Sequence, residues 1–185
     1  MSNIKVLCLT GFSECGKSTA GEFLSKSNFY RLKCSKLLYE KAVREVPECV
    51  DKSIWSTIKN LEKKFGKQGL SEQLVHELIN RIQGTEHNYY VVDSVASLPV
   101  VNRLRESFGK ENVKILALLS SEKTRLERCR TEGEREQLLL KDAGKELWGL
   151  KELITNADYT LDNEVSLDSF ISNLDKVANI FKEER

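Results

Sequence analysis

The chain has few of the features that divide a protein into separate parts. It contains only two prolines in 185 residues, and it has no serine- and glycine-rich linker, internal repeat or low-complexity stretch. A chain of this length is enough for one compact domain with a sizeable core, but hardly for two. We therefore expect residues 1–185 to form a single domain.

A strong charge of either sign is also missing. The sequence has 29 basic and 28 acidic residues, which gives a formal net charge of +1. This balance provides no general attraction to nucleic acid or to an anionic membrane, although it does not exclude a local basic cleft. No stretch approaches the ~20 consecutive apolar residues that a membrane helix needs, and the first residues lack the apolar run of a signal peptide. We expect a cytoplasmic protein with no membrane partner, and the oligomeric state stays open.

Cysteine and histidine are too sparse and scattered to indicate a metal site. The five cysteines are odd in number and form no C-x-x-C pair, and neither of the two histidines has a cysteine at ligand spacing. Zinc sites usually show such spacing. Reduced thiols and structural or surface histidines are the expectation.

Short apolar runs typical of buried strands alternate with longer helical patterns. The expected strands are 4–10, 29–34, 89–93, 113–119 and 157–161, and the expected helices are 17–27, 35–46 and 167–181. Residues 51–87 show only helical spacing, broken at Gly66 and Gly69. This alternation predicts βαβ units around a parallel sheet. The expected fold is a three-layer α/β domain with about five parallel strands and a helical excursion between the second and third strands.

The stretch LTGFSECGKST, residues 9–19, fits the pattern G-x-x-x-x-G-K-[ST]. It follows a predicted strand and opens a predicted helix, which is the context that a phosphate-binding loop requires. Two glycines allow the backbone to approach a phosphate closely, and the loop amides and the helix N-terminus attract its charge. The candidate nucleotide-binding residues are Gly11, Phe12, Ser13, Glu14, Cys15, Gly16, Lys17, Ser18 and Thr19.

Specific roles follow for three of these residues. Lys17 should reach the β- and γ-phosphates of ATP, and the Ser18 hydroxyl should bind Mg²⁺. Cys15 lies near a helix N-terminus, where a thiol can become reactive. A small residue tolerated in a loop that acts mainly through its backbone is the favoured interpretation of Cys15, and oxidative sensitivity is the alternative.

Asp93 ends the predicted strand YYVVD and is the candidate carboxylate partner of the magnesium ion, directly or through water. It could also accept the proton of an acceptor hydroxyl. The alternative is an aspartate that only caps the turn after a strand.

The sequence resembles the P-loop nucleotide-kinase-like proteins, particularly the branch that contains dephospho-CoA kinase and archaeal adenylate-kinase-related proteins. Two segments carry this resemblance most specifically. They are LTGFSECGKSTAGEFL, which resembles the phosphate loop and first helix, and the closing segment ADYTLDNEVSLDSFISNL. The resemblance implies a P-loop NTPase fold, an acceptor-binding helical insertion at about 51–87 and a short lid at about 130–145. It also implies ATP- and Mg²⁺-dependent transfer of a phosphoryl group to a small nucleotide or nucleotide-like acceptor.

The sequence departs from this family where charged residues usually hold the substrates. Many relatives carry an arginine three residues after the strand aspartate, where this chain has Ala96. The matching lid stretch is Lys141 to Lys145 and includes Ala143 instead of the charged pattern. After the second strand, Ser35 and Lys36 stand where dephospho-CoA kinases carry an aspartate. These departures leave the acceptor open.

A group of arginines precedes and enters the expected lid. Arg128 and Arg135 are candidates for binding γ-phosphate oxygens during transfer, and Arg130 is a candidate for nucleotide binding. For Arg125, a functional role and a place on a solvated charged helix are equally favoured, because glutamates are interleaved with the arginines. Lys36 and Lys64 are weaker candidates for acceptor contacts, and Trp55 is expected to pack rather than to stack on a base.

Three functional hypotheses follow. The leading one is a small-molecule kinase whose acceptor is a nucleoside monophosphate, a nucleoside or a dephospho-CoA-like compound. The second is a nucleotide-binding regulator or degenerate kinase without acceptor turnover. The third, phosphorylation of a nucleic-acid end or modified base, is disfavoured by the near-zero net charge, and a guanine-specific GTPase is disfavoured because no N-K-x-D motif is present.

Overall fold

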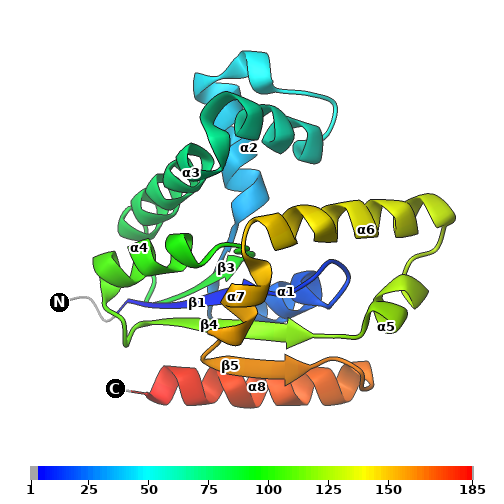
Figure 1. Cartoon of the computed structure of the whole chain (residues 1–185). Coiled ribbons are helices and arrows are strands. Elements are labelled where there is room, and N and C mark those ends of the chain that lie inside the picture. The colour runs from blue at the N-terminus through cyan, green and yellow to red at the C-terminus, as the bar shows by residue number, and fades with distance from the viewer. Residues whose placement is uncertain (1–3, 185) are drawn as a thin grey trace.

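A computed structural model describes residues 4–184 and contains a five-stranded parallel sheet with helices on both faces (Figure 1). The strands are β1 (Lys5–Thr10), β2 (Tyr30–Lys33), β3 (Tyr89–Asp93), β4 (Val113–Leu119) and β5 (Tyr159–Asp162). The helices are α1 (Lys17–Lys26), α2 (Cys34–Glu45), α3 (Ile54–Gln83), α4 (Leu98–Phe108), α5 (Glu122–Glu127), α6 (Glu132–Leu147), α7 (Leu150–Thr155) and α8 (Leu167–Glu183), with a short 3₁₀ helix at Pro47–Cys49. The strand order is β2-β3-β1-β4-β5, and all four pairings are parallel. The expected three-layer α/β fold is confirmed.

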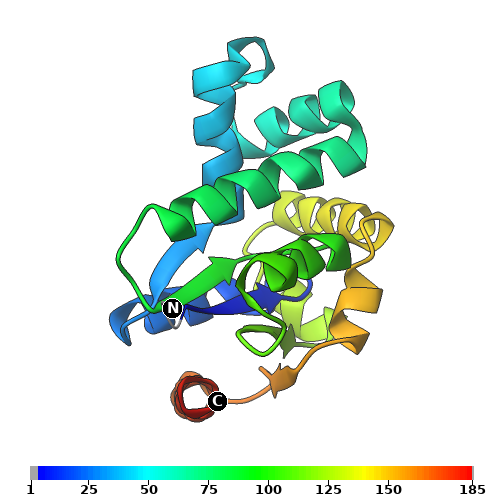
Figure 2. The ribbon, with the colours of Figure 1, turned by 90° about the vertical axis from the view of Figure 1, so that its left-hand side faces the viewer.

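The central strand β1 explains the layering. All six of its residues are buried, as expected of a strand covered on both faces. Val6 and Cys8 face a core shared with α3, α4 and α7. Leu7 and Leu9 face the opposite core, shared with α1 and α8. Figure 2 shows these helical layers on the two sides of the sheet.

The helical excursion between β2 and β3 is also confirmed. Helix α3 covers nearly all of it and changes direction at Gly66, whose φ of 69° interrupts the helical backbone. Helix α2 and the residues of α3 on both sides of Gly66 enclose a small core of their own, built around Leu38, Leu61 and Leu70. Figure 1 shows this part rising above the sheet. Its role in acceptor binding remains a prediction, as does the division of the chain into one domain with an insertion and a lid.

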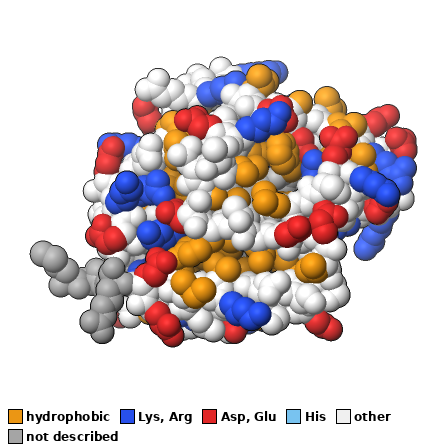
Figure 3. Space-filling view, turned by 60° about the horizontal axis from the view of Figure 1, so that its bottom comes forward, with side chains coloured by type: hydrophobic (Ala, Val, Ile, Leu, Met, Phe, Trp, Pro, Cys, Tyr) orange, Lys and Arg blue, Asp and Glu red, His pale blue; other side chains and the backbone are white. Residues whose placement is uncertain are grey.

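Basic and acidic side chains are interspersed on the surface. Figure 3 shows one face on which blue and red groups alternate around patches of hydrophobic side chains. Within residues 4–184, no helix is long and apolar enough to cross a membrane.

Candidate functional site

The predicted phosphate loop lies between the end of β1 and the start of α1, at the carboxyl edge of the sheet. Gly16 has a φ of 102°, and a Cβ there would lie 2.4 Å from the Asn163 side chain. A Cβ on Gly11 would lie 2.5 Å from the Leu118 carbonyl oxygen. Only glycine fits these two positions, because both combine a left-handed backbone with a close neighbour. The loop therefore has the tight path that its sequence pattern predicts.

The Lys17 ammonium lies over this loop. Its Nζ donates to the Phe12 carbonyl oxygen and lies 3.4 Å from the Cys15 sulfur. Ser18 and Thr19 are exposed in the first turn of α1. Cys15 is fully buried beneath the loop, which favours a packing role over a reactive thiol.

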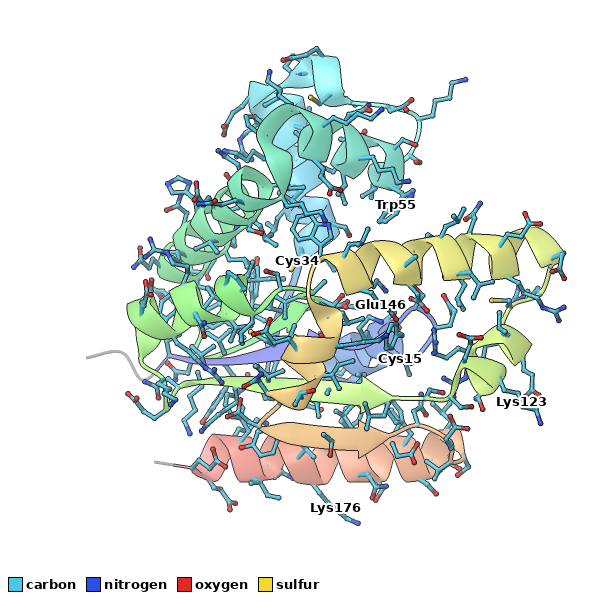
Figure 4. All side chains as sticks on the ribbon, in the orientation of Figure 1. Cys15, Cys34, Trp55, Lys123, Glu146 and Lys176 are labelled. Atoms are coloured by element: carbon cyan, nitrogen blue, oxygen red, sulfur yellow. The ribbon has the colours of Figure 1, made fainter. Side chains whose placement is uncertain are left out.

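A cavity of about 1010 Å³ opens from the loop. Five basic side chains line it, namely Lys17, Arg128, Arg130, Lys141 and Lys145, against two acidic ones, Glu14 and Glu134. Ser35 and Trp55 line its far side. Figure 4 shows Trp55 beyond α6, across from Cys15. The cavity thus joins the phosphate loop, α6 and the start of α3 around a surplus of positive charge, which suits an anionic ligand.

The predicted arginines separate into three environments. Arg128 lines the cavity and donates to the carbonyl oxygens of Glu14 and Asn163, at 2.8 and 2.6 Å. Arg130 lines the cavity and is exposed. Arg135 is not part of the cavity lining; its Nη1 lies 3.1 Å from Glu132 on the outer side of α6. The structure therefore brings Arg128 and Arg130 to the loop and leaves Arg135 outside it.

Arg125 belongs to a buried network that sequence reasoning missed. Its guanidinium pairs with Asp142 of α6 and donates to the Ser13 carbonyl oxygen at 3.1 Å. Asp142 also accepts from the Ser13 backbone amide at 2.7 Å. Asp142 on α6 therefore holds the phosphate loop through its Ser13 amide and through Arg125. The role of Asp142 could not be predicted from the sequence, because this residue lies 129 residues from Ser13 in the chain.

Asp93 is also paired. Arg31 of β2 donates from Nε and Nη2 to the same Asp93 oxygen, at 3.1 and 2.5 Å. Nη2 donates as well to the carbonyl oxygen of Ser18 at 3.2 Å. Arg31 lies in no recognisable motif, yet it connects the two predicted magnesium partners.

The oxygen donors at this point fit magnesium bound together with a nucleotide. Mg²⁺ is usually held by one or two carboxylates, substrate phosphates and several waters. The exposed Ser18 hydroxyl and the second oxygen of Asp93 suit that coordination, and the ion would screen the phosphate charge. Within residues 4–184, no group of three or more acidic, histidine or cysteine side chains is arranged as a metal site.

Three weaker candidates can also be placed. Lys36 is exposed and lies 3.7 Å from Glu40, and Lys64 pairs with Glu48. Neither lines the cavity. Trp55, in the first turn of α3, is 39% exposed and does line the cavity, whereas a packing role was expected.

Glu164 fixes the loop that carries Asn163. It accepts from the Ser120 hydroxyl at 2.9 Å, from the backbone amide of Ser121 and from the Thr124 hydroxyl. These hydrogen bonds, the one from Thr124 most of all, lower the pKa of Glu164 to about 2.

Glu164→Gln should lower the melting temperature at pH 7 by a small amount, and the difference from wild type should vanish in acid. A carboxylate with a lowered pKa stabilises the fold above its unfolded pKa of about 4.5 and loses that effect as the pH falls towards 2. Thermal unfolding followed between pH 7 and pH 2 checks this. A difference that stays constant across that range would contradict it.

The parallel sheet, its strand order and the glycine loop at the end of β1 define the P-loop NTPase fold in its nucleotide-kinase form. Solved structures with this fold include TT1252 from Thermus thermophilus, with a TM-score of 0.65 and 15% identity over 96% of this chain and 97% of that one. Shikimate kinase from Acinetobacter baumannii in complex with shikimate gives 0.63 and 15%, over 100% and 96%. A gluconokinase from Sinorhizobium meliloti gives 0.54 and 16%, over 100% and 99%. Because these sequence identities are only 15–16%, the structural likeness shows a common fold and nothing about activity.

Two relatives by sequence belong to Archaeoglobus fulgidus and Thermococcus kodakarensis. A UPF0200/UPF0201 protein of Archaeoglobus fulgidus is 26% identical over 94% of this chain, which spans only 55% of the length of that protein. A UPF0200 protein of Thermococcus kodakarensis is 22% identical over 94% of this chain and 96% of its own length. No protein-family model matches the chain. Together these likenesses support the P-loop fold and do not favour the dephospho-CoA kinase branch in particular.

Proposed function

We propose that the protein is an ATP- and Mg²⁺-dependent kinase that phosphorylates a small anionic acceptor, with nucleotides and nucleotide-like compounds as the leading class. One observation supports this most strongly: the phosphate loop opens into a cavity of about 1010 Å³ with five basic side chains. A site that only held a nucleotide's phosphates would not need a cavity that continues past these basic side chains to Ser35 and Trp55. Phosphoryl transfer depends mainly on positioning and charge stabilisation, which such a cavity supplies.

The reaction would run along the cavity. An acceptor oxygen forms a bond to the γ-phosphorus of ATP while the bond to the bridging oxygen breaks, and the electron pair of that bond leaves with ADP. Lys17 and Arg128 would neutralise the phosphate oxygens, and Ser18 and Asp93 would hold Mg²⁺. A hydroxyl acceptor also loses its proton, for which Asp93 is our candidate. Arg130 would contact the nucleotide from the lid side.

The test is ADP formation from ATP and Mg²⁺ with a panel of acceptors, with Lys17→Ala as the blank. The panel holds nucleoside monophosphates, nucleosides and dephospho-CoA, and also shikimate and gluconate, because a shikimate kinase and a gluconokinase share the fold. We expect one class to raise turnover above the blank. If no acceptor does so, catalysis is refuted.

The pairing of Asp93 with Arg31 favours one alternative, a nucleotide-binding regulator without acceptor turnover. A carboxylate already neutralised by arginine is a weaker metal partner. Tight ATP binding without acceptor-dependent turnover would distinguish this regulator from a kinase. A nucleic-acid end as acceptor is the least supported alternative, and a gel shift at low and moderate salt checks it.

A further inference from the structure

A second lysine reaches the phosphate loop from the opposite side to Lys17. Lys145 lies near the end of α6, and its Nζ donates to the Ser13 hydroxyl at 2.9 Å. Its side chain is only 22% exposed and lines the large cavity. An ammonium group has three N–H donors, so one bond to Ser13 leaves two for a ligand in the cavity.

The charges that face Lys145 do not balance. Asp142, one turn earlier on α6, lies 3.8 Å away, but its carboxylate already pairs with Arg125 and the loop amide of Ser13. Lys17 of α1 and Arg125 of α5 add positive charge, and the Cys15 side chain also lies nearby. Burial is the larger cause and the positive charge of Lys17 the next, and together they lower the pKa of Lys145 to about 8. Arg125 and Lys145 thus share one carboxylate with Lys17 close by, and an anion placed among these cations would be strongly bound.

We propose that Lys145 is a second phosphate-binding lysine, which contacts the terminal phosphate of a bound nucleoside triphosphate from α6 while Lys17 contacts it from α1. This assignment rests on the proposed function of the loop. It also gives a role to the stretch from Lys141 to Lys145, because both of these lysines line the cavity next to the loop. Lys145 keeps its proton during transfer and stabilises the charge on the γ-phosphate oxygens.

Proton uptake on binding tests this contact without any need for turnover. Calorimetry of ATP with Mg²⁺ at pH 8, in buffers of different ionisation enthalpy, should show net proton uptake by the wild-type protein. Burial lowers the pKa of Lys145 to about 8, so part of the Lys145 population is neutral in the free protein at that pH, and a bound polyphosphate restores its charge. ADP should cause less uptake than ATP, since it lacks the terminal phosphate.

Three variants make the result specific. Lys145→Met should lose the uptake and bind ATP more weakly while its affinity for ADP changes little. Lys145→Arg should keep ATP affinity but lose the uptake, because arginine stays protonated at pH 8. Lys176→Met, on the exposed face of α8, should match wild type in both measurements. If the methionine variant folds poorly, the loss of proton uptake in the arginine variant still tests the contact.

Turnover separates this inference from the proposed function. With a working acceptor, Lys145→Met should lower kcat by about 10²-fold, the usual effect of losing one preorganised charge partner, and Lys145→Arg should restore much of it. Unchanged proton uptake and unchanged kcat in a folded Lys145→Met protein would refute the contact between Lys145 and the phosphate. The proposed kinase activity would not be affected by that result. Wild-type uptake without transfer to any acceptor would refute the kinase and support the contact.

Discussion

Asp142→Ala should lower the free energy of unfolding by about 3–5 kcal/mol, because it leaves the buried Arg125 without a counter-charge. Arg125 and Asp142 are only 5% and 7% exposed, so water cannot replace the lost carboxylate. The variant also loses the acceptor of the Ser13 amide, which holds the phosphate loop. Urea unfolding measures the change, and ATP binding should weaken in parallel.

The double variant Arg125→Met/Asp142→Leu is the matched control. Replacing a buried ion pair by apolar side chains of similar size is often neutral, whereas removing one partner is costly. We therefore expect the double variant to regain most of the lost stability but not the loop geometry, so that unfolding recovers and ATP binding does not. A single variant within about 1 kcal/mol of wild type would mean that Arg125 finds water when Asp142 is gone.

The fold could be predicted from local patterns because those patterns are strong in this sequence. β3 and β4 occupy the residues expected from the apolar runs YYVVD and VKILALL. β5 begins at Tyr159 instead of residue 157. The difference arises because Asp158 turns its carboxylate to the Ile115 amide at 2.8 Å and so lies outside the ladder. Such side-chain contacts move element ends by a residue or two without changing the topology.

The site could be predicted only where a motif placed all its residues together. The loop from Gly11 to Thr19 is local in sequence, and its position after β1 follows from the pattern. The partners of that loop come from far along the chain. Arg31 and Asp93 are 62 residues apart, and Asp142 lies 129 residues beyond Ser13. No spacing rule connects such pairs, so Arg125 could not be recognised as a structural residue, nor Lys145 as a cavity residue.

Asp93→Asn should lower kcat/KM by about 10³-fold, the upper end of the effect of one lost electrostatic partner. Asparagine keeps the shape but not the charge, so Arg31 would then present an unpaired cation 3.2 Å from the Ser18 carbonyl oxygen. That cation would repel Mg²⁺ from Ser18. The Mg²⁺ concentration for half-maximal rate should therefore rise, which a magnesium titration at fixed ATP measures.

Arg31→Met should shift the same titration in the opposite direction. It releases the Asp93 carboxylate from its only arginine partner among residues 4–184, and a free carboxylate attracts Mg²⁺ more strongly. The expected decrease in half-saturating Mg²⁺ is roughly tenfold, the scale of changes in groups next to a metal ligand. Opposite shifts in the two variants would place Asp93 in the metal shell. Equal increases in both would instead mean that Arg31 and Asp93 form a structural pair, and that the metal depends on Ser18 and the phosphates alone.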